Sequence, residues 1–353
     1  MARSGEGEPK SVPRSESFRA FEYLLFGCAT VLVFLLCVCV GSVNIPMRDT
    51  VGAIMSALFG TEAPEGISVP VIMSVRLPRV ICTALVGAAL SLCGASVQGL
   101  LRNPLADSST LGVSSGAALG AVLAIAFDLR IPGLDGGGIA AFAMVFAFLT
   151  LVFIMSLAYK LDYSLSTNTI ILVGVVFSMF ASSMINLATT FSGERVRTIT
   201  FWMMGSLAGT SYGDVAFLSI SLFLCGGVLL RYAQELNAFA IGEDNARHVG
   251  IDVKRVKLFV LIAVAALVGI CVSIGGSIGF VGLIIPHMTR MITGPNHRRL
   301  LPASLFSGAI FLMLADLVAR ILLRPLELHI GVVTSIIGSV LFVYIFYSTR
   351  KVR

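Results

Sequence analysis

Apolar runs long enough to cross a membrane recur along the whole chain. A bilayer's hydrocarbon core is about 30 Å thick and a helix rises about 1.5 Å per residue, so one crossing needs about 20 largely apolar residues. Two runs, 108–127 and 279–292, are diluted by polar residues or short, as helices buried in protein can be. The other runs are clear and begin near Leu24, Val80, Ile139, Ile170, Val215, Leu258, Pro302 and Gly331. We expect an all-α polytopic membrane protein with about ten transmembrane helices, eight being the alternative count.

A weak internal repeat accompanies this pattern. An Ala-Leu-Val-Gly segment, followed by Ser and Gly at the same offsets, occurs at residues 84–94 and again at 266–276. With ten crossings and an inner N-terminus, the first copy runs from outside to inside and the second from inside to outside. Inverted-topology halves have this relationship. We therefore expect an inverted internal repeat.

The chain has no linker that would divide it into domains. Residues 1–20 mix Ser, Pro, Gly, Glu and Arg, a composition typical of a disordered tail, here a cytoplasmic one. Residues 21–353 form a single transmembrane domain, whose longest internal loop spans about 234–255. That loop is either a connector with anchoring charges or a docking element for a cytoplasmic partner.

Composition and charge agree with a membrane protein. The chain is 57% hydrophobic and 12% charged, with a mean hydropathy of +0.95, far from the soluble norm of about 25% charged. The net charge of +6 would suit nucleic-acid binding, but the basic residues lie in short loops between apolar runs. About two thirds of the 25 Lys and Arg fall on the inner side when both termini are cytoplasmic, as the positive-inside rule requires. A nucleic-acid partner is therefore not expected.

Motifs for catalysis and for bound metals or cofactors are missing or out of context. The seven cysteines lie inside apolar runs without metal-ligand spacing, and the four histidines form no H-E-x-x-H. A G-x-S-x-G pattern at residues 112–116 opens a transmembrane segment, whereas a serine hydrolase needs a strand-to-helix turn. The chain also lacks G-x-x-x-x-G-K-[ST], so any ATP-driven work requires a partner. We expect no enzyme activity, metal or cofactor.

Polar residues inside the apolar runs are the remaining candidates. Asp316 is the one plainly intramembrane acid, and Arg320 follows four residues later, a spacing that allows pairing on one helix face. The fifth run carries Ser178, Ser182, Asn186 and Thr189, at spacings of 4, 4 and 3 that place them on one face. That face is either glue between helices or the wall of a polar path.

Seven segments, taken in order, resemble the FecCD-type permeases, the type II membrane subunits of ABC importers for iron-siderophore complexes, heme and cobalamin. The resemblance covers almost everything from Leu24 to the C-terminus. Its carriers are RLPR at 76–79, GAAL at 87–90, RNPLA at 102–106, LGVSSG at 111–116, GFVGLIIPH at 279–287, AD at 315–316 with AR at 319–320, and IGVVT at 330–334.

The resemblance implies a homodimer of ten-helix permeases in the inner (plasma) membrane, two cytoplasmic ATPase subunits and an extracytoplasmic binding protein. By residue match, the arginines that dock the binding protein are Arg76, Arg79 and Arg320. The cytoplasmic gate is Asn103, Leu105, Ser166, Thr167 and Asn168. The segment that couples to the ATPase contains Gly242, Glu243, Asn245, Ala246, Arg247 and Gly250. On this view the polar face of the fifth helix becomes a pathway wall.

The expected function is ATP-driven import of an iron complex, either a siderophore complex or heme. The nearest alternative is cobalamin import by the same machinery. An ion-coupled secondary transporter is a third class, but its coupling sites usually contain unpaired acids or unwound carbonyls, whereas Asp316 already has Arg320 as a neighbour. No single residue separates a ferric chelate from heme or a corrinoid.

Overall fold

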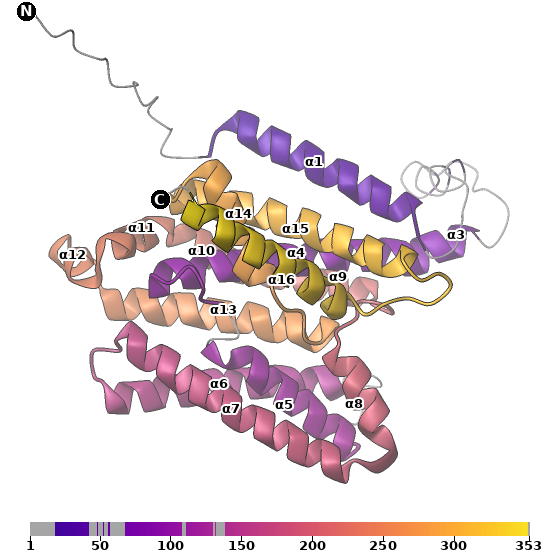
Figure 1. The fold of residues 1–353 in the computed structure, drawn as a ribbon, viewed down its shortest axis with the longest axis horizontal. Helices are drawn as coiled ribbons and strands as arrows, with labels where there is room; N and C mark the ends of the chain where they lie inside the picture. The colour runs from indigo at the N-terminus through magenta and orange to yellow at the C-terminus, as the bar shows by residue number, and fades with distance from the viewer. Residues whose placement is uncertain are drawn as a thin grey trace, which may run out of the picture.

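The computed structural model describes residues 18–41, 68–107, 111–129 and 138–351, with the single residues 48, 52, 56 and 131. Over these residues the regular structure is helical (Figure 1). The first helix begins at Ala20, close to the predicted start of the membrane domain. The tail predicted over 1–20 falls largely on residues 1–17, which lie outside the described residues.

Within the described residues, seven helices are long and apolar enough to cross a membrane. Two of them contain π-helical turns: η1 (Ile72–Arg76) joins α3 (Ser68–Val71) to α4, and η4 (Leu222–Gly226) joins α9 to α10. The seven are α1 (Ala20–Cys39), α4 (Leu77–Leu101), α6 (Gly138–Leu161), α7 (Thr167–Phe191), α9 with α10 (Tyr212–Ser221, Gly227–Arg231), α13 (Val253–Gly275) and α15 (His297–Ile321).

Three further helices complete the predicted set. They are α5 (Val113–Ala126), α14 (Val281–Thr293) and α16 (Ile330–Lys351), and they occupy the two weaker runs and the last one. With 14 and 13 residues, α5 and α14 rise only about 20 Å, less than the hydrocarbon core. Both pack against neighbouring helices, which explains how such short helices are accommodated.

The centre of the molecule is α4, whose residues are almost all buried. Its sequence is rich in Gly, Ala, Ser and Cys, which lets neighbouring backbones come close. A side chain on Gly87 would collide with the backbone of Gly308 in α15, and one on Gly94 with that of Gly282 in α14. The small residues of the GAAL segment therefore serve helix packing.

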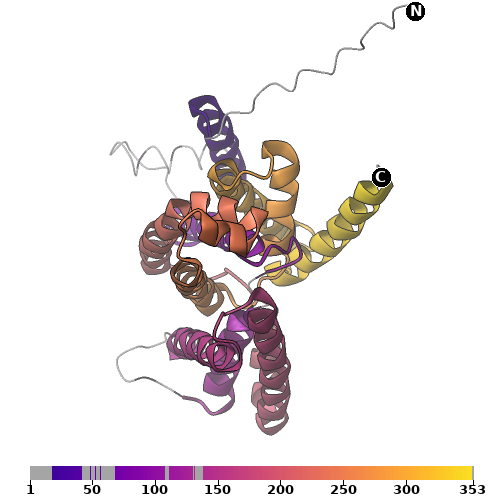
Figure 2. The same cartoon turned by 90° about the vertical axis from the view of Figure 1, so that its left-hand side faces the viewer.

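Two groups of helices flank α13. On one side α5, α6 and α7 pack together, and on the other α4 packs against α15, with α1 on the outer side of α15 (Figures 1 and 2). At one end lie α11 (Ala233–Ile241) and α12 (Glu243–His248), which turn the predicted loop 234–255 into two short helices. At the other end lie α3 and the short α8 (Val196–Met203), which follows the 3-10 turn η3 (Gly193–Arg195).

The predicted repeat has a counterpart in the backbone. Each copy is a long helix that ends next to a residue with positive φ, Arg102 (49°) after α4 and Gly276 (68°) after α13. Each is followed by a short helix that begins at another such residue, Gly112 (73°) before α5 and Phe280 (68°) before α14. The same order of elements and turns in both copies supports a structural duplication.

Candidate functional site

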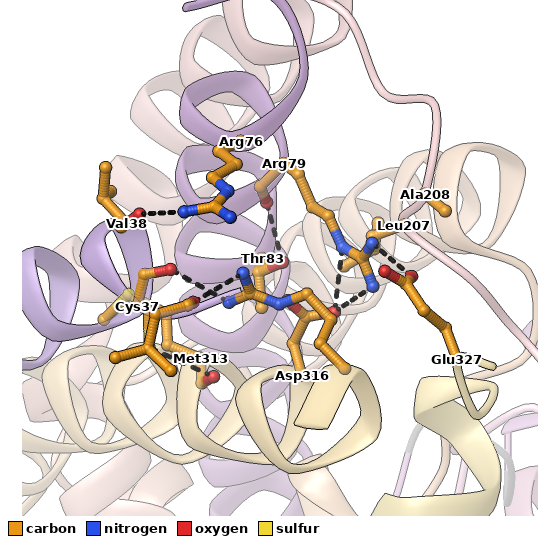
Figure 3. A network of polar contacts seen from close by, with 12 residues as sticks. Cys37, Val38, Arg76, Arg79, Thr83, Leu207, Ala208, Met313, Asp316 and Glu327 are labelled. Carbon is orange, nitrogen blue, oxygen red and sulfur yellow. Dashed lines mark hydrogen bonds and ion pairs between the residues drawn. The ribbon is translucent and has the colours of Figure 1, made fainter. Parts of the chain in front are cut away.

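At one end of α4 and α15, a buried cluster of charges joins the two helices (Figure 3). Arg79 of α4 donates from Nε and Nη2 to Asp316 Oδ1, at 3.1 and 2.9 Å, and from Nη1 to Glu327 Oε2 at 2.7 Å. Asp316 also pairs with Arg320, whose Nε lies 2.9 Å from Oδ2. The predicted pairing of Asp316 with Arg320 is therefore confirmed.

Two arginines of the same cluster hold the end of α1. Arg320 donates to the carbonyls of Cys37 and Val40 at 3.1 Å, and Arg76 donates to those of Val38 and Cys39 at 3.3 Å. The last carbonyls of a helix have no partners within the helix and carry partial negative charge, so cations are favourable there. The arginines fix the C-terminal end of α1 against α4 and α15. We call this cluster the α1 clamp: Arg76, Arg79, Asp316, Arg320 and Glu327.

The three arginines of the α1 clamp are more buried than the residues of a simple docking surface would be. Arg76, Arg79 and Arg320 are only 5%, 7% and 2% exposed, and the guanidinium group of each binds partners in the chain. Sequence position alone places these arginines near an interface but does not show that acids and carbonyls of the same chain surround them. Their role in binding another protein stays a prediction.

At the opposite end of α4, the predicted coupling segment folds as predicted around its glycines. The short helix α12 lies between Gly242 (φ 138°) and Gly250 (φ 86°), conformations that side chains rarely adopt. Ala246 is fully buried, while Asn245 and Arg247 are exposed. The helix therefore rests on the membrane domain through Ala246 and presents polar residues outward.

One carboxylate of α12 connects three parts of the chain. Glu243 Oε1 accepts from Thr167 Oγ1 at 2.9 Å and from Lys257 Nζ at 2.8 Å, and Lys257 also donates to Leu165 O at 2.7 Å. Lys257 belongs to α13 and is fully buried. We call this group, Leu165, Thr167, Glu243 and Lys257, the inner latch. It joins the predicted coupling segment directly to a predicted gate residue.

The loop between α6 and α7 that carries Thr167 is organised by Asp162. Its carboxylate accepts from the hydroxyl and N–H of Ser164, at 2.7 and 2.8 Å, and from the N–H of Ser166 at 3.1 Å. These hydrogen bonds, with Ser164 first and Ser166 next, lower the pKa of Asp162 below its ordinary value. Ser166 caps the N-terminus of α7, and Asn168 is exposed in its first turn. The loop that carries the predicted gate residues is thus held by hydrogen bonds among its own residues.

The other predicted gate residues follow α4. Asn103 is half-buried, and its Oδ1 accepts from the N–H of Leu105 at 2.9 Å, which closes a tight turn. Leu105 is 51% exposed. The guanidinium of the preceding Arg102 lies beside Gly242, within 3.8 Å of the point where a Cβ there would be. Both loops that carry predicted gate residues therefore contact the start of α12.

The polar face predicted on the fifth helix lies on α7 and is largely uncovered. Ser182 and Asn186 are exposed, and neither side chain has a hydrogen bond to another helix among the described residues. Ser178 and Thr189 are half-buried and donate to the carbonyls of Gly174 and Ile185 in their own helix. Within the described residues, Ser182 and Asn186 thus do not hold helices together by hydrogen bonds, which favours the alternative that they line a pathway.

Sequence reasoning missed Lys257, Asp162 and Glu327. Lys257 was counted only as an inner basic residue, although it follows Val256 and precedes Leu258, inside the apolar helix where a lysine is costly without a partner. That position was the available signal. Asp162 and Glu327 are ordinary loop acids in the sequence, and only the fold brings them to their partners. Among the described residues, no group of three His, Cys, Asp or Glu could hold a metal.

Comparison with known proteins places the chain among ABC permeases. A model of the FecCD transport family matches residues 29–348. The uncharacterized ABC transporter permease protein YvrB of Bacillus subtilis is 40% identical and covers 86% of this chain and 87% of its own length. The cobalamin import permease BtuC of Halobacterium salinarum is 38% identical, over 80% of this chain and 74% of its own length. The molybdate import permease MolB of Haemophilus influenzae is 34% identical, over 94% of this chain and 97% of its own length.

A solved structure has the same fold. It is described as an inward-facing ABC transporter of the metal-chelate type, and it superposes with a TM-score of 0.82 at 31% identity. The superposition covers 94% of this chain and 100% of the other. The type II permease fold predicted from sequence is confirmed.

Proposed function

The chain belongs to the FecCD transport family, and on that premise we propose that it is the permease subunit that carries an iron complex, a siderophore complex or heme, in an ATP-driven importer. The observation that carries this proposal is the family match over residues 29–348 together with the matching fold. The chain's part is transport, because the chemistry of ATP hydrolysis needs a phosphate-binding loop that its sequence lacks.

An iron complex is favoured over other cargo by the structural relative of metal-chelate type. Cobalamin is the alternative, supported by a relative of 38% identity. The permease for molybdate, at 34%, shows that members of this family differ widely in cargo at similar identity. Such breadth fits a permease that lacks a tight site of its own and receives its cargo from a binding protein.

Coupling to ATP is supported by the inner latch. We expect two cytoplasmic ATPase subunits to contact α12 and the exposed apolar residues on either side of it, Ile241 and Val249. A displacement of α12 then acts on Thr167 through Glu243 and on the Asn103 loop through Arg102. A ligand can shift a two-state equilibrium only through contacts that differ between the states. The latch provides contacts of this kind between the ATPase-facing helix and the loop that carries Thr167, and Arg102 lies between that helix and the Asn103 loop.

Docking of an extracytoplasmic binding protein is supported by charge more than by exposure. The α1 clamp contains three arginines and two acids, and the exposed Arg324 lies close by in sequence. The excess of positive charge favours an acidic partner at this end of the molecule. Because the three arginines are buried, we expect the clamp to act through its electrostatic field and through the position of α1, with Arg76 contributing most to the excess charge.

The assembly we propose contains two copies of this chain, with both termini in the cytoplasm of an inner (plasma) membrane. The exposed polar face of α7 then lines the path between the two copies. The exposed side chains of Ser182 and Asn186 can form hydrogen bonds with a bulky polar cargo without binding it tightly. We therefore expect the cargo to leave the path easily.

Reconstitution tests the proposal. The chain is placed in proteoliposomes with the ATPase and binding protein encoded beside it, and uptake of ferric siderophore, heme and cobalamin is measured with and without ATP. We expect ATP-dependent uptake of one iron complex and co-purification of that complex with the binding protein. Uptake by the permease alone along a proton or sodium gradient would contradict the proposal of an ATP-driven importer. Uptake of cobalamin and of neither iron complex would make cobalamin the cargo.

A further inference from the structure

A groove of about 1130 Å³ runs between the α9–α10 helix and α13 and reaches α4 and α15. Its walls are apolar, and among its lining residues are Leu85, Leu222, Phe223, Val228, Phe259 and Leu305. Phe223 is 80% exposed, so the groove opens on the side of the molecule rather than into its core. Its volume exceeds that of most small-molecule pockets, about 300–1,000 Å³.

The depth of the groove matches one leaflet of a bilayer. Ser219 and Arg231 both line it and are 12 residues apart along one continuous helix. At about 1.5 Å per residue, this separation is about 18 Å, a little more than half of a hydrocarbon core of about 30 Å. Since Arg231 and Arg255 belong to the basic inner ends of their helices, the groove spans the inner leaflet.

The polar residues of the groove gather at this inner end. Arg231 is exposed, and it forms a long ion pair of 3.9 Å from Nη1 to Glu235 Oε1. Arg255 is exposed too, with its guanidinium 5.8 Å from the ring centre of Phe259, and among the described residues it has no acidic partner. Two guanidinium groups at headgroup depth, weakly paired, are suited to a phosphate.

Glu235 adds the opposite charge beside these arginines. It lines the same groove, and its Oε2 is buried without a hydrogen-bond partner. A carboxylate oxygen in that state is costly unless a donor reaches it. The terminal torsion of a Glu side chain rotates easily, so a donor in the groove can form a hydrogen bond with this oxygen at little cost. A cationic N–H group that enters with the phosphate meets both requirements.

We propose that this groove binds a phospholipid with a primary amine in its headgroup, a phosphatidylethanolamine, taken from the inner leaflet. Arg231 and Arg255 bind its phosphate, Glu235 accepts hydrogen bonds from its ammonium, and one acyl chain lies along Leu222, Phe223 and Phe259. Phosphatidylcholine carries no N–H on its headgroup nitrogen, and phosphatidylglycerol carries no cation. The lipid bridges α10 and α13, which flank α11 and α12. This inference does not depend on the cargo or on the ATPase.

The test uses the intact chain, stripped of lipid in detergent and reloaded with phosphatidylethanolamine, phosphatidylcholine or phosphatidylglycerol. Native mass spectrometry measures how much of each lipid is retained. One charge-assisted hydrogen bond corresponds to about tenfold in affinity, so we expect about tenfold stronger retention of phosphatidylethanolamine than of phosphatidylcholine. Equal retention of the three lipids, or preference for phosphatidylglycerol, would overturn the proposal.

Two variants assign the preference to the groove. Glu235→Gln keeps the shape of the side chain, and we expect it to remove the preference for the amine while phosphate-dependent binding remains. Arg231→Ala with Arg255→Ala should remove retention of all three lipids. The matched control is Lys254→Ala, next to Arg255 but with its ammonium 4.0 Å from the ring centre of Tyr163. A preference that survives Glu235→Gln, or a groove that a second copy covers so that the dimer retains no lipid, contradicts the proposal.

Discussion

The α1 clamp and the inner latch lie at opposite ends of α4 and bury charge in different ways. In the clamp, Asp316 is enclosed by Arg79 and Arg320, and the arginines also bind the backbone of α1. In the latch, one carboxylate, Glu243, holds one lysine and one hydroxyl. The clamp joins helices of the central core, whereas the latch joins the six-residue helix α12 to a loop and to the end of α13 that is predicted to be cytoplasmic. A network that locks helices suits a fixed end, and a network of few bonds on short elements suits an end that moves.

The largest effect on stability is expected from the clamp. Asp316→Ala leaves Arg79 and Arg320 buried without their shared acid, and loss of one partner in a buried ion pair costs about 3–5 kcal/mol. The free energy of unfolding, measured by denaturant titration in detergent, should fall accordingly. The matched control is Asp128→Ala. Asp128 forms an ion pair of 3.2 Å with Arg195, and both side chains are about half exposed, so we expect a loss of only about 0–1 kcal/mol in the free energy of unfolding. Equal losses in both variants would mean that the clamp does not fix the C-terminal end of α1.

The latch should affect coupling more than folding. Lys257→Met removes the charged contact between α12 and α13 and leaves Glu243, which is partly exposed, and substitutions in a coupling route alter coupling by about 0.5–2 kcal/mol, or about two- to thirtyfold. Substrate imported per ATP hydrolysed, measured in proteoliposomes, should fall by that factor. The control is Lys254→Met, on the neighbouring turn outside the latch. If the ratio is unchanged while the ATPase still binds, α12 is only an anchor.

A smaller effect is expected on binding-protein capture. Arg76→Gln removes a positive charge that donates to the carbonyls of Val38 and Cys39, so the fold loses less than with Asp316→Ala. Capture of the binding protein should weaken about fivefold at low salt and less at high salt, because salt screens the attraction. Surface plasmon resonance at two ionic strengths measures this. Arg195→Gln, at the same end, is the control. Capture that does not change removes the docking role of Arg76.

The smallest effect on stability is expected outside both networks. Ser182→Ala and Asn186→Ala change exposed side chains, and surface substitutions usually stay within about 0.5 kcal/mol. The unfolding free energy should therefore be unaltered while the rate of cargo uptake changes. A clear loss of stability in the assembled dimer, with an unaltered uptake rate, would instead make these residues glue between the two copies.

The sequence predicted the fold well because spans follow from composition. Length and hydropathy gave the positions of α1, α4, α6, α7, α13 and α15, since each must cover the same hydrocarbon thickness. Helices occupy both weak runs, as predicted: α14 is as short as expected, and α5 covers residues 113–126 of the run 108–127. The candidate site was predicted less completely. Arg76, Arg79 and Arg320 were expected to face outward, and no local pattern indicates that α1 and Glu327 enclose them.

By itself, the sequence of this protein determined the membrane class, the approximate helix count, the glycine-bounded helix α12 and the pairing of Asp316 with Arg320. These depend on local chemistry: hydropathy over about 20 residues, positive φ at glycine, and a spacing of four on a helix. Only the tertiary structure decided that Arg79 shares Asp316 and that Lys257 meets Glu243 and Leu165. These partners come from different helices, and their approach depends on how the small residues of α4 let its neighbours pack, which no single segment specifies.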